Sequence, residues 1–201
     1  MMRSYSYKRI AVLILILFSA LIFTFLDIGL SSSESSANSN IGSYSSGTVP
    51  DSFPKVISIF VERGGMYNEK LSGEMIRALE DEGFDVTAST ELQAEYPAQA
   101  LFVSVNDEDV FYTPVYADSQ LDVMFVYSSS GSSEYFEKFR DSDDTVPLIF
   151  TSDGSRSYKL LMQGSIELQD ITRGLFSGRY YERHIRETVA EEVVKNVQSQ
   201  L

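Results

Sequence analysis

His184 is the residue on which any nucleophilic chemistry in this chain would depend. It is the one histidine in a sequence of 201 residues that contains no cysteine. Serine and threonine are plentiful, but no G-x-S-x-G nucleophile elbow occurs, so a serine hydrolase would need His184 as its base. Arg183 and Arg186 lie beside it near the start of a predicted helix, and neighbouring cations make an imidazole a poorer proton acceptor. We therefore interpret His184 as a surface or boundary residue.

The sequence offers few ligands for a metal ion. One histidine and no cysteine argue against zinc and copper sites, which rely on these side chains. Two acidic stretches, residues 106–109 and 141–144, supply oxygen atoms, but neither has the glycine and the distal glutamate of an EF-hand loop. We interpret both stretches as solvated turns and keep weak calcium binding as the alternative. No metal ion and no cofactor is expected.

Phosphate and sugar sites are also disfavoured by the residue pattern. Gly64 and Gly65 lie between a predicted strand and a predicted helix, where a phosphate could bind. They lack the G-K-[ST] ending and the dinucleotide spacing, so we interpret the pair as a tight turn. The many acidic residues allow carboxylate pairs by chance, and a chain without tryptophan has no indole on which a sugar ring could stack.

One stretch combines arginine with tyrosine in a way that is typical of protein interfaces. Residues 154–186 carry a net charge of +3, whereas residues 106–144 carry a net charge of −8. The candidate interface consists of Arg173, Arg179, Tyr180, Tyr181, Arg183 and Arg186. Such a face could bind an acidic protein partner or a second copy of the chain. The alternative is that these arginines pair with acidic residues of their own domain.

The acidic balance of the chain limits its partners. The chain has 29 acidic and 16 basic residues, and the net charge of −13 falls entirely on residues 53–201. Such a surface repels phosphate backbones, so nucleic-acid binding is not expected. Without cysteine the domain has no disulfides, and its stability must come from packing, to which 12 tyrosines and 13 phenylalanines contribute.

The elements that would position these residues predict one compact mixed α+β domain. Residues 55–62 predict a buried strand, residues 69–82 a helix capped by Asn68, and residues 84–88 a second strand. This order is a βαβ unit, for which parallel strands and a right-handed crossover are expected. The predicted buried face of the helix consists of Leu71, Met75, Ile76 and Leu79.

Antiparallel strands with short turns are predicted in the rest of the domain. The acidic turn at 106–109 separates two strands, and a turn at Asp118–Ser119 precedes another. The later pattern predicts a helix at 134–140 and strands at 146–151, 158–169 and 175–181, with a bulge near Gly164 and a turn at Arg173–Gly174. The C-terminal segment from His184 predicts an amphipathic helix packed on the sheet through Ile185, Val189, Val193 and Val197. We expect about six to eight strands with two main helices on one face.

The N-terminal region predicts a single transmembrane helix over residues 10–30. Residues 10–26 contain no charged side chain, and the whole stretch would span about 30 Å as a helix, which matches the hydrocarbon core of a bilayer. Arg3, Lys8 and Arg9 precede this apolar run. The basic residues place residues 1–9 in the cytoplasm and the C-terminal domain outside.

Between the anchor and the domain, residues 31–52 predict a flexible tether. Serine, asparagine and glycine dominate this stretch, and it has too little apolar surface to offset the entropy cost of ordering. A signal peptidase could instead cut among the small residues at 35–37 or 29–31, which is the alternative to a retained anchor. In either case residues 53–201 are expected to be exported.

These observations rank functions but predict no reaction. The favoured hypothesis is a membrane-anchored extracytoplasmic domain that is not an enzyme and that binds a protein partner, an envelope complex or a second copy of itself. The second hypothesis is a ligand-binding or sensory domain with a pocket near Tyr112, Tyr116 and Tyr127. The third is a hydrolase, which would require an acid and a hydroxyl within hydrogen-bonding reach of His184. Besides protein, the expected partner is the lipid bilayer through residues 10–30.

Overall fold

Six strands form one mixed sheet, in the order β1-β6-β5-β4-β2-β3, in the computed structural model of the chain. The structure describes residues 10–15, 18–19, 23, 26–47, 54–62, 64–140, 159–199 and 201. The strands are β1 (Gly29–Ser46), β2 (Val56–Val61), β3 (Asp85–Ser89), β4 (Gln99–Thr113), β5 (Tyr116–Ser128) and β6 (Lys159–Phe176). The helices are α2 (Gly65–Asp81), α3 (Glu134–Arg140) and α4 (Gly178–Gln198). The predicted mixed α+β class is confirmed for this domain.

The predicted βαβ unit is present near the start of the domain. The strand β2 pairs in parallel with both β3 and β4, and α2 connects β2 to β3. The helix begins directly after Gly64, earlier than predicted, so Asn68 lies inside it and is not its cap. Gly83, with a φ of 80°, ends the helix, and glycine suits this position because it adopts a positive φ without steric cost.

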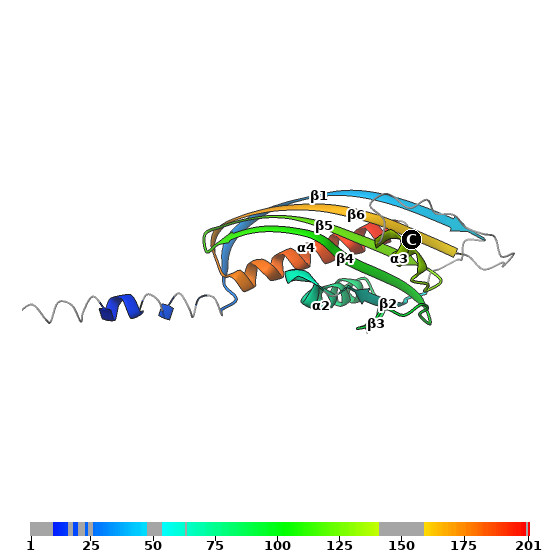
Figure 1. The fold of residues 1–201 in the computed structure, drawn as a ribbon, viewed down its shortest axis with the longest axis horizontal. Helices are drawn as coiled ribbons and strands as arrows, with labels where there is room; N and C mark the ends of the chain where they lie inside the picture. The colour runs from blue at the N-terminus through cyan, green and yellow to red at the C-terminus, as the bar shows by residue number, and fades with distance from the viewer. Residues whose placement is uncertain are drawn as a thin grey trace, which may run out of the picture.

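The other four strands, β4, β5, β6 and β1, form an antiparallel half that bows over α4 (Figure 1). Both α2 and α4 pack on the concave face and share one apolar core with it. The predicted stripe of α4 is buried in this core; it consists of Ile185, Val189, Val193 and Val197. Each such side chain stabilises the fold by roughly 1.5–3 kcal/mol when fully buried, so the stripe holds α4 against the sheet.

A second, smaller core lies on the opposite face of the sheet, under α3. Phe136 of α3 stacks on Phe102 of β4 with ring centroids 5.4 Å apart, and it meets Phe60 of β2 edge-on at 6.0 Å. This core also includes Met124, Val126 and Leu161. The helix at residues 134–140 was predicted with these bounds, and its Phe136 is buried.

Residues 29–46, most of which were predicted to be a flexible tether, form the edge strand β1 in the structure. This strand pairs antiparallel with β6 over its full length. The prediction failed because small polar side chains bury little apolar surface by themselves, whereas the hydroxyls of this segment find polar partners on β6, where they are buried, and on α4. Ser33 bonds Thr172 at 2.7 Å, and Ser39 accepts a hydrogen bond from Asn196 of α4 at 3.0 Å.

Three turns predicted from local pattern are absent from the sheet. The acidic stretch at 106–109 continues β4, with a bulge between Val105 and Asp107, and the turn to β5 falls at Pro114 and Val115 instead of at 118–119. The segment 175–181 is not a strand, because β6 runs through Arg173–Gly174 to Phe176 and α4 starts at Gly178. The predicted strand at 146–151 lies outside the described residues.

Gly164 was predicted to mark a bulge, but the register of β6 is continuous there with both neighbouring strands. The glycine instead makes room for Phe125 of β5, the residue paired with it. A Cβ at position 164 would lie 2.5 Å from the Phe125 ring, which is closer than real Cβ contacts. Because glycine has no side chain, position 164 of β6 leaves space for the Phe125 ring of β5.

The N-terminal segment is described only in part. Residues 10–15 are helical, and the large apolar side chains described there and at Phe18 are exposed. Gly29 and Leu30, the last two residues of the predicted span, belong to β1. Within the described part of the chain, no helix is long and apolar enough to cross a membrane.

Candidate functional site

A hydrogen-bonded network around Asp170 is the most polar part of the concave core. Asp170 of β6 is fully buried and sits where β1, β6 and α4 meet. Its Oδ2 accepts hydrogen bonds from Ser35 at 2.6 Å and lies 2.9 Å from His184 Nε2, and its Oδ1 accepts one from Thr172 at 2.9 Å. Burial acts to raise the pKa of Asp170, but the hydrogen bonds from His184, Ser35 and Thr172 outweigh it and lower the pKa.

The arrangement of this network does not match a catalytic triad. A triad needs the hydroxyl nucleophile on one imidazole nitrogen and the carboxylate on the other. Here the hydroxyls of Ser35 and Thr172 bond the carboxylate, and among the described residues His184 has an acid partner but no side-chain hydroxyl partner. The network therefore joins three elements and leaves no activated nucleophile on the imidazole.

Two larger polar groups are buried close to this network. Tyr67 of α2 is almost completely buried, and its Oη has no hydrogen-bond partner among the described residues. Burial, followed by the charge of Glu182, raises its pKa. Arg186 of α4 is also buried, with its Nη1 3.7 Å from Glu182. Buried polar groups of this kind ordinarily bond internal water, and their position between α2 and α4 indicates a structural role.

The six residues of the predicted interface do not form one surface. Tyr181 and Arg186 face the core and are buried. Tyr180 and Arg183 are half-buried, and the Arg183 guanidinium lies over the Tyr180 ring at 5.6 Å. Arg173 and Arg179 are exposed, the first on β6 and the second on the first turn of α4. The exposed part of the predicted face is therefore smaller than the sequence suggested.

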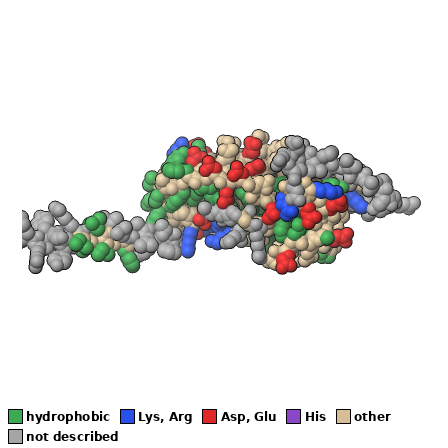
Figure 2. Space-filling model, viewed as in Figure 1, with side chains coloured by type: hydrophobic (Ala, Val, Ile, Leu, Met, Phe, Trp, Pro, Cys, Tyr) green, Lys and Arg blue, Asp and Glu red, His purple; other side chains and the backbone are tan. Residues whose placement is uncertain are grey.

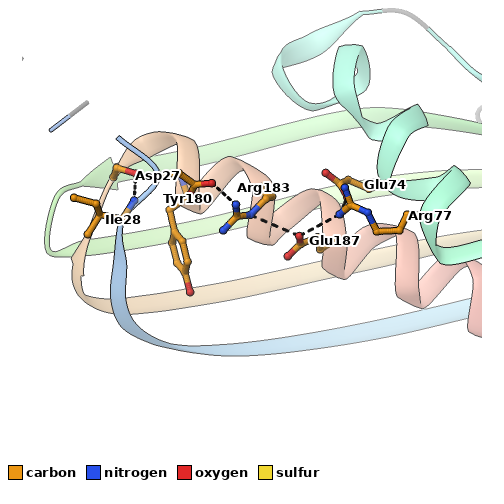
Figure 3. Close-up of polar contacts among 8 residues, drawn as sticks. Asp27, Ile28, Glu74, Arg77, Tyr180, Arg183 and Glu187 are labelled. Carbon is orange, nitrogen blue, oxygen red and sulfur yellow. Dashed lines mark hydrogen bonds and ion pairs between the residues drawn. The ribbon is translucent and has the colours of Figure 1, made fainter. Parts of the chain in front are cut away.

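Arg183 belongs to a chain of ion pairs that links the N-terminal segment to both helices (Figure 3). It pairs with Asp27 and, at 3.6 Å, with Glu187. Glu187 in turn lies 3.7 Å from Arg77 of α2, which bonds Glu74 at 2.6 Å. The contact with Glu187 is a pairing within the same domain, the alternative that was kept open for this arginine, whereas Asp27 belongs to the N-terminal segment.

The three tyrosines proposed for a ligand pocket lie apart from one another. Tyr112 packs on the concave side against Phe176 and donates a hydrogen bond to its carbonyl oxygen at 3.0 Å. Tyr116 bonds Asp118 at the β4–β5 turn, and Tyr127 is buried at the other end of β5, where it bonds Gln99. They share no cavity in the described part of the structure.

An open groove of about 150 Å³ runs between α2 and α4. Its lining consists of Glu74, Arg77, Ala78, Asp81, Glu187, Ala190 and Glu191. Charged side chains already paired with one another dominate this surface, whereas small-molecule sites are mostly apolar with a few polar groups. The groove is therefore a seam between two packed helices.

The two acidic stretches differ in how far the structure describes them. Within the described residues, no group of three or more acidic or histidine side chains is placed to hold a metal ion. Residues 106–109 extend along β4, which separates their side chains onto both faces of the sheet, and residues 141–144 lie outside the described residues. Gly64, one of the two glycines considered for a phosphate site, is exposed and directly precedes the first residue of α2.

Comparison with solved structures yields a weak likeness. No protein-family model matches the chain, and no curated protein sequence matches it either. Among solved structures, the chain is similar to the PelC dodecamer from Paraburkholderia phytofirmans, with a TM-score of 0.36 and 10% sequence identity. The match covers 78% of this chain and 95% of that chain. We draw no conclusion about this protein from a likeness at that level.

Proposed function

We propose that this chain is a single-pass membrane protein whose folded domain lies outside the cytoplasm and binds a protein partner without catalysing a reaction. The observation that carries the proposal is the apolar run at residues 10–26. It contains no charged residue, and the large apolar side chains described at residues 10–15, 18 and 26 are exposed. So many exposed apolar side chains are unfavourable in water, and the hydrocarbon core of a bilayer would remove them from it.

The charge pattern around this run supports the proposed orientation. Arg3, Lys8 and Arg9 precede it, whereas Asp27 and Glu34 follow it. No basic residue occurs between the end of the run and Lys55. Basic residues are retained on the cytoplasmic side of a membrane span. The acidic domain, which follows the run, is therefore assigned to the outer side.

The free edge of β1 supports the partner-binding part of the proposal. Among the described strands the sheet ends at β1, so along residues 34–40 one side of this strand has backbone groups that no other described strand pairs. Residues 34–40 are exposed, and the strand contains no lysine, no proline and no register shift against β6. Lysine, proline and bulges are features with which natural proteins protect edge strands. At an edge without them, an extended segment of another protein can add a strand.

Site-directed labelling tests the proposed topology, since the chain has no cysteine of its own. In intact cells, a membrane-impermeant maleimide should label the Ser36→Cys variant, because position 36 is exposed on β1. The Ser4→Cys variant, in the predicted cytoplasmic segment, should be labelled only after the cells are lysed. The reverse pattern would show that the domain lies in the cytoplasm.

A pair of lysine substitutions tests the partner-binding edge. Asn38→Lys places a charge in the exposed middle of β1 and should reduce recovery of a cross-linked partner by about tenfold, which corresponds to a loss of about 1.4 kcal/mol. Gln120→Lys places the same charge on the exposed face of β5, an interior strand, and should leave recovery unchanged. Equal recovery from both variants would remove β1 as the binding edge.

A further inference from the structure

Four large apolar side chains are exposed together at one end of the sheet. They are Leu30, Phe111, Val115 and Leu175, with exposed fractions of 73%, 59%, 60% and 47%. Leu30 and Leu175 are paired across β1 and β6, and Phe111 and Val115 lie at the end of β4 and in the β4–β5 turn. We call these four residues the apolar tip, and Figure 2 shows hydrophobic side chains gathered at this end of the body, next to the N-terminal segment.

Amphipathic and basic side chains surround the apolar tip. Tyr116 packs its ring 6.2 Å from that of Phe111 and donates its hydroxyl to Asp118. Arg173 is paired with Tyr116 across β5 and β6 and is exposed. Apolar side chains bordered by tyrosine and arginine are the composition found where a protein meets the headgroup layer of a membrane.

The chain enters the domain at this same end. The carbonyl oxygen of Ile28 accepts a hydrogen bond from the Ser177 backbone at 2.8 Å, and the Ile28 amide donates to Ser177 Oγ at 3.2 Å. Asp27 is held by the ion pair with Arg183, and Tyr180 packs its ring against Gly29. Because Ser177 also caps α4, the entering chain is fixed to the first turn of that helix.

Chain length then decides how far the apolar tip can lie from the apolar run. Only Asp27 and Ile28 separate Leu26, the last residue of the run, from the first residue of β1. The three residue steps from Leu26 to Gly29 span at most about 11 Å. The headgroup layer is roughly 5–7 Å deep on each side of the bilayer, so the start of β1 cannot lie far beyond it. The tether predicted at residues 31–52 would have allowed a wide separation, and its folding into β1 removes that freedom.

We propose that the apolar tip inserts into the headgroup region of the bilayer that holds residues 10–26, so that the domain is fixed on the membrane and β1 leads away from it. This inference rests on the membrane anchor proposed above. The charge beside the tip is balanced, because the ion pair with Arg183 neutralises Asp27 and the exposed Arg173 offsets Asp118, whereas the domain as a whole is acidic. Four side chains are too few for a stable dimer, which buries about 1,200–2,000 Å² in total.

The absence of cysteine allows a direct test on the full-length chain. The Val115→Cys variant, labelled with an environment-sensitive fluorophore, is reconstituted into phosphatidylcholine liposomes that contain a shallow spin-labelled quencher lipid. The matched control is Val56→Cys, which is 45% exposed at the start of β2, near the opposite end of β4. Both positions are at the surface, so neither change disturbs the core.

We expect the quencher lipid to quench the label at position 115 at least about twofold more than the label at position 56, because interfacial residues reach about 5–10 Å into the boundary of the acyl chains. Equal quenching at the two positions in liposome-bound protein would overturn the insertion of the tip and leave the anchor intact. If the chain does not float with the liposomes, the anchor is absent, and both the proposed function and this inference fall.

Discussion

Asp170 is the buried charge that joins β1, β6 and α4. Three hydrogen bonds lower its pKa despite its burial, and their donors come from His184, Ser35 and Thr172. A carboxylate with a lowered pKa stabilises the fold fully above its unfolded pKa of about 3.9. This stabilisation is lost as the pH falls through the lower pKa of the folded state.

We expect Asp170→Asn to lower the free energy of unfolding at pH 7 by about 1–3 kcal/mol, because the amide leaves at least one buried donor without an acceptor. The loss should shrink as the pH falls below about 4, where the wild-type carboxylate also becomes protonated. Urea denaturation at several pH values measures both effects. Asp109→Asn, at an exposed position of β4, is the control and should change stability by less than about 0.5 kcal/mol.

Residues 31–46 are a flexible tether in the prediction from the sequence and part of the edge strand β1 in the structure. As a tether, residues 31–46 would have freely exchanging amides. As an edge strand paired with β6 alone, the segment has amides that alternately face β6 and the open side. Backbone groups bonded in a sheet exchange only when the sheet opens, whereas those facing solvent exchange quickly.

Hydrogen exchange followed by NMR should therefore show protection at every second amide along residues 31–41. The protected amides should slow by at least about 100-fold, since opening β1 requires breaking the Ser35 contact with Asp170 as well as the ladder. Uniformly fast exchange over this stretch would show that β1 does not form. Gln120 and its neighbours in β5, which is paired on both sides, provide the internal reference for full protection.

Across the whole molecule, the convex face concentrates negative charge. Asp107, Asp122 and Glu167 stand side by side on β4, β5 and β6. Burial first, and then the charges of Glu167 and Asp107, raise the pKa of Asp122. A raised carboxylate pKa destabilises the fold at neutral pH, whereas the lowered pKa of Asp170 stabilises it. The destabilisation by Asp122 disappears as the pH falls below the raised pKa and the carboxylate becomes protonated.

Replacing the central charge should therefore stabilise the protein. We expect Asp122→Asn to raise the free energy of unfolding at pH 7 by roughly 0.2–1 kcal/mol in low salt, the size of a typical cross-strand side-chain interaction, because like charges directly opposite each other are destabilising. The gain should shrink in 1 M sodium chloride, because salt at that concentration screens charges beyond about 3 Å. Urea denaturation at both salt concentrations checks this, and an equal gain at both would mean that burial of the carboxylate, not repulsion by Asp107 and Glu167, is responsible.

The sequence by itself determined the elements that depend on local periodicity. The stripe Ile185, Val189, Val193 and Val197 lies on one side of a helix at any position in space, and the strand–helix–strand order from residue 55 implies parallel pairing. The helix at 134–140 follows for the same reason. The apolar character of residues 10–26 can also be seen without a structure.

Only the tertiary structure decided the role of residues 29–46 and of the residues that gather around them. Ser35 and Asp170 are 135 positions apart, and no local pattern in a serine-rich segment indicates that a buried carboxylate will meet it. The apolar tip likewise combines residues from β1, β4, the β4–β5 turn and β6. Helical periodicity is encoded within a few neighbouring residues, whereas strand pairing depends on the surface that a distant strand supplies.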